Sequence, residues 1–258
     1  MHKSGEDFKI RFPANDSVQT FHCFSVYGID PRILKEKWFE IFSAIVGELK
    51  ISVNKLYYEF DRDQSNTTKS VSTIEKLKGK LQLDGRGLSY AIGEEVLKGG
   101  MPGQNRSVSI NIDIGSIYVC FRASLNDAIE ISKSLSSEVA VFHPSYGFLV
   151  HGPDGFFVHA WCAGVSYDGM SIGEERAVQR LSSGRTKMKE NLHDLYVFNL
   201  LTNKHLDRRV GQSSLRDFIS DTGAGSLTEI PGGLSVWILD VKEINATREI
   251  LVDSGIVF

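Results

Sequence analysis

Apolar and polar residues alternate along the first part of the chain in patterns that predict several strands and one long helix. Residues 8–12 and 18–27 are rich in aromatic and β-branched side chains, which is typical of strands. Asp30 and Pro31 then supply an N-cap and a first-turn proline, and apolar residues recur at helical spacing over the following turns. A strand over residues 53–60 is expected after this helix.

The middle of the chain predicts a short helix, a hairpin and a second amphipathic helix. The short helix is lysine-rich and covers residues 72–81. Alternating runs at 108–112 and 117–121 predict two strands joined by a turn near Gly115. Ser124, followed three residues later by an aspartate, forms a capping box that begins the next helix.

The second half of the chain predicts the same mixture of elements. Strands are expected at residues 139–142, 148–151, 156–162, 234–239 and 256–258. Helices are expected at residues 173–181, after Ser214, and at 241–254 with Gly255 as the C-cap.

The strands come in adjacent pairs with helices between them. This order predicts an α+β fold with a largely antiparallel sheet, or sheets, built from hairpins, and with helices packed on one side. We expect a single domain over residues 1–258. A division into two halves of similar size, 1–137 and 138–258, stays open.

The composition is that of an ordinary globular protein with a slight acidic excess. Hydrophobic residues make up 41% of the chain and charged residues 24%. The 29 Lys and Arg nearly balance the 32 Asp and Glu, and the formal net charge is −3. Basic residues fall in short, scattered clusters, such as those within 185–189 and 204–209, which are typical of solvated faces. We therefore expect no nucleic-acid partner.

The chain carries no membrane or targeting signal that we recognise. Its first residues are polar, and no apolar run approaches the roughly 18 residues that cross a bilayer. Cys23, Cys120 and Cys162 are odd in number and far apart in sequence, which fits neither a disulfide framework nor a Cys-x-x-Cys motif. These features predict a cytoplasmic protein with no membrane contact and no cofactor.

Three histidines at eight-residue intervals, His143, His151 and His159, form the densest group of side chains able to bind a metal or move a proton, and Cys162 follows them. If Gly152-Pro-Asp-Gly155 forms a tight hairpin turn, His151 and His159 point to opposite faces of the sheet. Ligands so arranged cannot share one metal, so we expect no metal site. A loop one residue longer or shorter would put both on one face, and a catalytic or metal-binding pair then stays an alternative.

Gly169-Met-Ser-Ile-Gly173 matches the Gly-x-Ser-x-Gly pattern of the nucleophile elbow, where a serine lies between a strand and a helix. No oxyanion stretch lies upstream, and hairpins do not build the parallel sheet that carries such an elbow. We expect a simple turn here, with Ser171 as the candidate nucleophile of a hydrolase alternative.

Residues 143–148 and 191–205 are dense in aromatic side chains, histidine, and asparagine or aspartate. One interpretation is a buried connection whose polar groups bond to the backbone. The other interpretation is a recognition surface. Its candidate residues are His143, Tyr146, Trp161, His193 and Asp194.

The C-terminal half loosely resembles the immunity proteins of type VI and polymorphic-toxin systems. The resemblance lies in His143-Pro144, Tyr146-Gly147-Phe148, the run from Asp194 to Asn199, and the segments 234–239 and 255–258. It implies a non-enzymatic bacterial protein that binds and blocks a partner toxin, with no cofactor and no catalytic residue. No binding residue can be carried over, because such families diverge at the interface.

We therefore expect a cytoplasmic binding protein with a protein partner, plausibly an immunity protein that neutralises a toxin by occluding it. The main alternative is a hydrolase or metal-dependent enzyme that uses Ser171 or the His151/His159 pair. A further alternative is an accessory subunit of a defence-system or phage assembly. The oligomeric state stays open.

Overall fold

The computed structural model describes residues 19–60, 69–71, 73–84, 88–95, 106–152, 155–166, 170 and 172–258. The strands are β1 (Thr20–Tyr27), β2 (Lys55–Phe60), β3 (Lys69–Val71), β4 (Leu88–Glu95), β5 (Arg106–Asn111), β6 (Ser116–Ala123), β7 (Tyr146–Gly152), β8 (Phe198–Thr202), β9 (Arg209–Val210), β10 (Ser213–Ser214), β11 (Ser226–Ile230) and β12 (Leu234–Ile238). The helices are α1 (Pro31–Glu48), α2 (Ile74–Asp84), α3 (Leu125–Ala140), α4 (Gly155–Ala163), α5 (Ile172–Ser183), the 3₁₀ helix η1 (Arg185–Lys189), α6 (Asn203–Leu206), α7 (Leu215–Thr222) and α8 (Ile244–Asp253).

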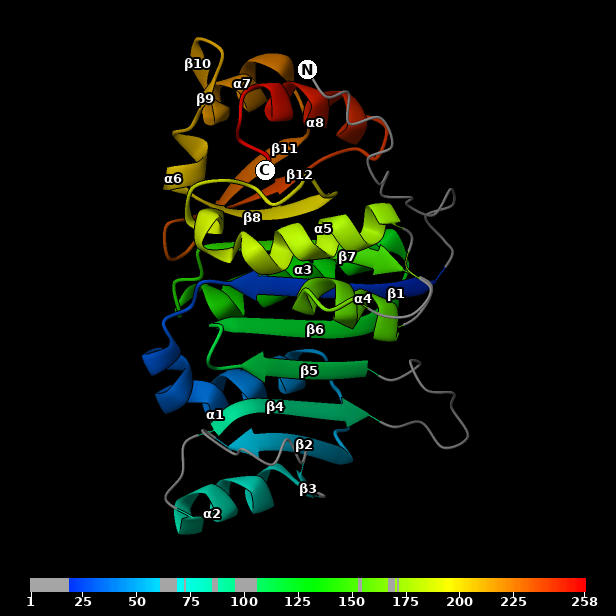
Figure 1. Cartoon of the computed structure of the whole chain (residues 1–258), viewed down its shortest axis with the longest axis vertical. Helices are drawn as coiled ribbons and strands as arrows, with labels where there is room; N and C mark the ends of the chain where they lie inside the picture. The colour runs from blue at the N-terminus through cyan, green and yellow to red at the C-terminus, as the bar shows by residue number, and fades with distance from the viewer. Residues whose placement is uncertain are drawn as a thin grey trace.

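Ten of the described strands form one sheet in the order β11-β12-β8-β7-β1-β6-β5-β4-β2-β3 (Figure 1). Every described pairing in it is antiparallel. The predicted α+β class with a largely antiparallel sheet is therefore confirmed. Along this order, the strands from residues 20–123 make up one half of the sheet, from β1 to β3, and the strands from residues 146–238 make up the other half.

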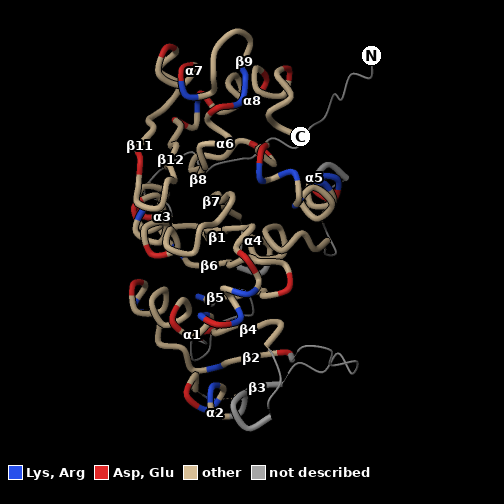
Figure 2. Tube along the Cα trace, turned by 90° about the vertical axis from the view of Figure 1, so that its left-hand side faces the viewer, with Lys and Arg blue, Asp and Glu red and all other residues tan. Residues whose placement is uncertain are grey.

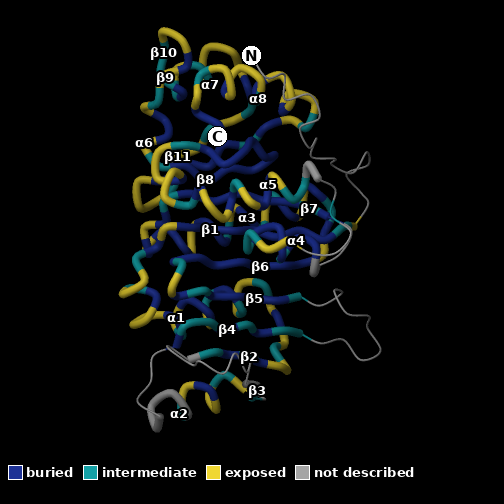
Figure 3. The backbone as a smooth tube through the Cα atoms, viewed as in Figure 1, coloured by how far each residue is buried: buried dark blue, intermediate teal, exposed yellow. Residues whose placement is uncertain are grey.

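The two halves of the sheet meet at β1. This strand pairs with β6 through its whole length and with β7 over Phe21 to Tyr27, so that Cys23 lies opposite both Cys120 and Val150. All of β1 except Thr20 is buried, and the buried backbone in Figure 3 is densest around it. A strand buried on both faces and paired on both edges belongs at the centre of a core.

Helices lie on both faces of the sheet, not on one. Figure 2 shows α1 and α3 on one side and α4 and α5 on the other. Helix α3 contacts β1, β6, β8 and β12, while α4 contacts β1, β6 and β7. Both faces of the central strands are thus covered, which explains why β1, β6 and β7 are buried in nearly every position. Among the described helices, none is both long enough and apolar enough to cross a membrane.

Three local signals for caps and turns are confirmed. Asp30 caps α1 by accepting the backbone N–H of Arg32, with Pro31 in the first turn. Ser124 accepts the backbone N–H of Asp127 at the start of α3. The predicted hairpin is formed by β5 and β6, with Gly115 in the left-handed conformation at its turn. These features depend only on neighbouring residues, which is why the pattern identifies them.

Two predicted strands are helical. Residues 156–162 belong to α4, and residues 139–140 end α3. The α4 segment is apolar on nearly every side, and Val158 and Cys162 are completely buried. A short apolar run cannot be assigned to strand or helix by periodicity, and burial under the neighbouring helix α5 decides it here. The predicted strand at residues 8–12 lies outside the described residues.

Replacing Gly115 with alanine should destabilise the protein more than the same change at Gly211. Both glycines have positive φ, at 72° and 62°, so either alanine costs about 1 kcal/mol of backbone strain. Only at Gly115 would the new Cβ lie 2.2 Å from the Ile29 carbonyl oxygen, whereas Gly211 has open space. We expect Gly115→Ala to lose about 1–3 kcal/mol more than Gly211→Ala in urea unfolding. Equal losses would contradict the close approach of the two turns.

Candidate functional site

His151 lies on β7 and faces a second histidine instead of His159. It pairs in register with His22 of β1, and the two ring centroids are 6.3 Å apart. His22 is completely buried and stacks on Phe121. Its Nε2 shares a hydrogen bond with the Thr20 hydroxyl, 3.1 Å away. Burial is the main cause that lowers the His22 pKa to about 4, with the neighbouring His151 as a second cause. His22 is therefore neutral at physiological pH.

His159 lies on α4 and packs over the opposite face of the sheet. Its Nε2 is 3.1 Å from the Ser109 hydroxyl, and its ring meets Tyr118 edge-on. Tyr118 projects from the face opposite to His22, because it pairs with Ser25 three places along β1. His151 and His159 thus lie on opposite faces of the sheet and do not converge. This agrees with the direction expected from a tight turn. The hairpin behind that expectation is wrong, since α4 is a helix.

The other enzyme candidate is Ser171, which lies outside the described residues, immediately before α5. Within the described part of the chain, no group of three or more His, Cys, Asp or Glu side chains is arranged to hold a metal ion. The three cysteines are buried and free.

His193 and His205 are completely enclosed and act as bridges between segments. His193 Nε2 lies 3.1 Å from the Ala177 carbonyl oxygen, so Nε2–H donates there and Nδ1 accepts from the Tyr196 hydroxyl at 2.9 Å. His205 Nε2–H donates to the Met188 carbonyl at 2.8 Å, and its Nδ1 lies 2.9 Å from the Thr202 hydroxyl. Burial, as the largest cause, lowers the pKa of each to about 4. Both ring nitrogens are used in each case, so these histidines are structural.

Four of the five candidate recognition residues belong to the core. Tyr146, Trp161, His193 and Asp194 are at most 2% exposed. Their burial corrects the surface interpretation, because none can touch a partner without unfolding. Tyr146 donates its hydroxyl to the Asp194 carbonyl at 3.0 Å, and Trp161 stacks on Phe157. Most of the two dense stretches is thus buried: residues 146–148 belong to β7, and residues 192–201 form a buried connection that continues into β8.

Asp194 holds the C-terminal helix to this connection. Its carboxylate receives two bonds from the Arg248 guanidinium of α8, and one oxygen also accepts the backbone N–H of Leu195 at 2.8 Å. The Asp194 side chain is 4% exposed and that of Arg248 is 19% exposed. A buried carboxylate with these partners is a structural anchor and not a free catalytic base.

His143 is the one member of the predicted recognition set that is exposed, and it borders two adjoining hollows. Each has a volume of about 500 to 550 Å³, and the two share Gly28, His143 and Lys189 in their walls. We call the pair the loop-end groove. Its walls come from six segments at one end of the sheet, around residues 27–33, 114, 142–145, 185–189, 202–204 and 232–234.

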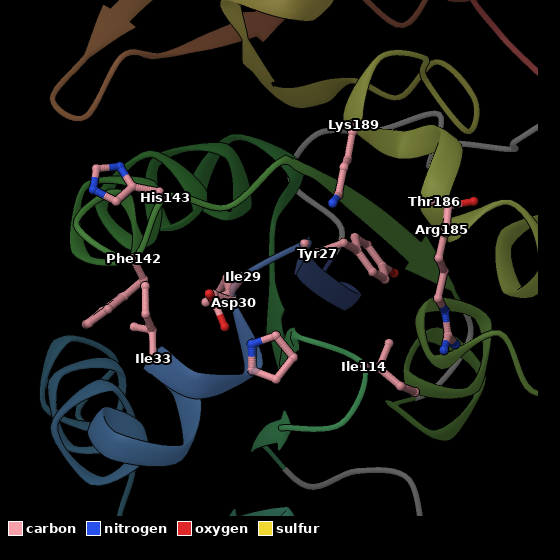
Figure 4. A pocket seen from close by; sticks show the side chains of 12 residues that line it. Tyr27, Ile29, Asp30, Ile33, Ile114, Phe142, His143, Arg185, Thr186 and Lys189 are labelled. Atoms are coloured by element: carbon pink, nitrogen blue, oxygen red, sulfur yellow. The ribbon is translucent and has the colours of Figure 1, made fainter.

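The charged side chains of the loop-end groove are mostly basic. Arg185 and Lys189 project into its first hollow from η1 (Figure 4), and Lys204 of α6 lines the second. Asp30 is the acid in its walls, and Arg32 binds it at 2.7 Å. Within the described part of the chain, Lys189 and Lys204 form no ion pair. The arrangement suits binding of negative charge more than proton transfer.

Sequence reasoning missed the basic residues of this groove. Arg185, Lys189 and Lys204 belong to two clusters that were interpreted as separate solvated faces. The fold brings them together because η1 and α6 lie beside the same ends of β7 and β8. The left-handed conformation of His143, with φ of 50°, has no reliable signal in its sequence.

No protein-family model matches the chain, and no curated protein matches it. Among solved structures, T6SS protein PA0821 of Pseudomonas aeruginosa aligns over 93% of this chain and 74% of its own, with a TM-score of 0.52 and 10% identity. The two proteins share a fold. The loose resemblance expected from the sequence is thus confirmed as a likeness of fold.

A second solved structure is the toxic C-terminal tip of CdiA from Pseudomonas aeruginosa in complex with immune protein. One of its chains covers 53% of this chain and 89% of its own length, with a TM-score of 0.29 and 13% identity. That score is too low for an argument about fold.

The buried histidines predict a loss of stability in mild acid. The folded-state pKa values of His22, His193 and His205, about 4, lie below the unfolded value of 6.5, so the unfolded chain binds more protons. Stability is then complete above pH 6.5 and falls as the pH drops towards 4. We expect a loss of about 2 kcal/mol per histidine by pH 5 in urea unfolding.

The control for this prediction is His143→Asn, which should keep the same pH dependence because His143 is exposed. His205→Asn should remove the contribution of one histidine, about 2 kcal/mol of the loss by pH 5. Equal free energies of unfolding at pH 7.5 and pH 5 would show that these imidazoles are not buried in their neutral form.

Arg248→Met should be strongly destabilising, because it leaves the buried Asp194 carboxylate without its counter-ion. Breaking a buried pair in this way costs about 3–5 kcal/mol. The matched control is Arg216→Met, which breaks the exposed pair with Glu229 and should cost at most about 1 kcal/mol. Thermal unfolding of both variants compares them directly, and similar shifts would contradict the anchoring role of Asp194.

Proposed function

We propose that this protein is a non-enzymatic binding protein that neutralises a bacterial toxin by occluding it, in the manner of an immunity protein. The observation that carries the proposal is the loop-end groove, which is built from six segments at one end of the sheet and whose charged side chains are mostly basic. Loops held by a rigid scaffold are a common way to build a recognition surface. The fold shared with T6SS protein PA0821 supports a role in bacterial competition.

The chemistry of the described residues supports binding over catalysis. Both ring nitrogens of His193 and of His205 form hydrogen bonds within the fold. His151 and His159 lie on opposite faces of the sheet. Nucleophilic catalysis needs a base within hydrogen-bond reach of the nucleophile and exposed to substrate. The proposed setting is the cytoplasm of the producing cell, where an immunity protein would meet a toxin before it acts.

Co-expression with the toxin should test the proposal. The candidate partner is the product of a secreted-effector gene adjacent to this gene in the host genome. We expect its toxic domain to stop growth of a bacterial host when produced alone, and co-production of this protein to restore growth. The two proteins should also elute together in size-exclusion chromatography. Continued growth arrest despite equal expression of both would reject the proposal.

The alternatives predict different results in the same assay. Ser171→Ala and His151→Gln should both protect as well as the unmodified protein, whereas an enzyme that inactivates the toxin through either residue would lose protection. Protection without a stable complex would also favour an enzyme. An accessory subunit of a defence-system or phage assembly would give no protection and would co-purify with a larger complex instead.

A further inference from the structure

We infer that the loop-end groove recognises an acidic polypeptide segment of the partner, one in which Asp or Glu side chains alternate with apolar ones. This inference rests on the proposed function and assigns it a surface. It starts from the contrast between the groove and the whole molecule. The chain carries a net charge of −3, yet three basic side chains and a single, already paired acid line this groove.

Arg185 is the most firmly held of the three basic residues. Its Nη2–H donates to the Ala163 carbonyl at the end of α4, 2.6 Å away, which fixes the direction of the guanidinium. Its buried Nε has no hydrogen-bond partner among the described residues. Figure 4 shows the side chain directed into the hollow, beside Ile114. The buried Nε cannot reach a partner, so the Nη groups are the part of this guanidinium that could bind a carboxylate, and the bond to Ala163 already holds them in one direction.

Lys189 and Lys204 extend the positive charge along the groove. Lys189 lies in the wall shared by both hollows, and Lys204 lies only in the second. The three charges are therefore spread along the groove. A single phosphate is bound best where several donors converge on one point, whereas spaced charges match spaced carboxylates on an extended chain.

Apolar side chains line the same hollows as these charges. Ile33 and Ile114, both partly exposed, line the first hollow, and the nearly buried Leu234 lines the second. The described lining has no exposed Phe, Tyr or Trp ring on which nucleic-acid bases would stack, since Tyr27 is 2% exposed and Phe142 is 9% exposed. A polypeptide can supply both the carboxylates and the apolar groups that these walls accept.

The groove is also formed before any partner binds. The Ser145 N–H donates to the Tyr27 carbonyl at 2.8 Å, and the Ile29 N–H donates to the Gly115 carbonyl at 3.1 Å. These bonds tie the loops that follow β1 to those that precede β7 and β6. A preformed surface avoids the entropy cost of ordering loops on association.

The test measures binding of a fluorescently labelled peptide of alternating glutamate and leucine by fluorescence anisotropy. A glutamine–leucine peptide of the same length and an oligonucleotide of the same charge are the comparison probes. The groove variant is Lys189→Glu with Lys204→Glu. The control variant is Lys37→Glu with Lys242→Glu, which changes the net charge equally at exposed positions outside the groove lining.

We expect the unmodified protein and the control variant to bind the acidic peptide alike. The groove variant should bind at least about tenfold more weakly, and binding by the unmodified protein should weaken as salt rises from about 50 to about 300 mM. Equal binding by the two variants, equal binding of the glutamine peptide, or tighter binding of the oligonucleotide would each overturn the inference. Matching circular dichroism spectra and melting temperatures exclude misfolding as the cause.

The co-expression assay separates this inference from the proposed function. If the groove variant still protects against the toxin as well as the control variant, the protein neutralises its partner through another surface, and the inference fails alone. If the unmodified protein gives no protection, the proposed function fails whatever the peptide result. Loss of protection in the groove variant alone supports both.

Discussion

The pairing of β1 with β6 on one edge and β7 on the other is the interaction on which the rest of this structure depends. It joins strands from residues 20–123 to strands from residues 146–238 in one sheet. Since β1 is buried on both faces, helices must cover both sides of the sheet, as α3 and α4 do. The same pairing brings the turns beyond Tyr27 and before Tyr146 to one end of the sheet, where the loop-end groove forms.

The sequence predicts the parts of this fold that depend on adjacent residues. The cap at Asp30 and the hairpin around Gly115 are encoded within a few positions, and both are found. The strand predicted over residues 156–162 is wrong for a physical reason. A short segment that is apolar nearly throughout is compatible with either a strand or a helix, and tertiary packing selects the helix. Strands β4, β8 and β11 were missed, because their alternation is interrupted or merges with neighbouring polar residues.

The candidate site was less predictable than the fold. The regular spacing of the histidines suggested a cluster. Spacing along the chain does not give the direction of each side chain, however, once a helix replaces the expected strand. The loop-end groove is the opposite case. Arg185 and Lys204 are distant in sequence from Gly28 and His143, and only the sheet order makes them neighbours. No local pattern in a single sequence reports such a juxtaposition, although each basic cluster was visible separately.

Most of the residues that carry the resemblance to immunity proteins lie in the core, with His143 as an exposed exception. Tyr146, Asp194 and Trp237 are at most 2% exposed, so they maintain the fold. PA0821 shares the fold at 10% identity, so this fold tolerates extensive change of sequence. Under the proposed function, specificity for a partner would lie in exposed side chains that can change without cost to the core. The exposed Lys189 and Lys204 of the loop-end groove meet this condition, because they contact solvent and form no ion pair within the described part of the chain.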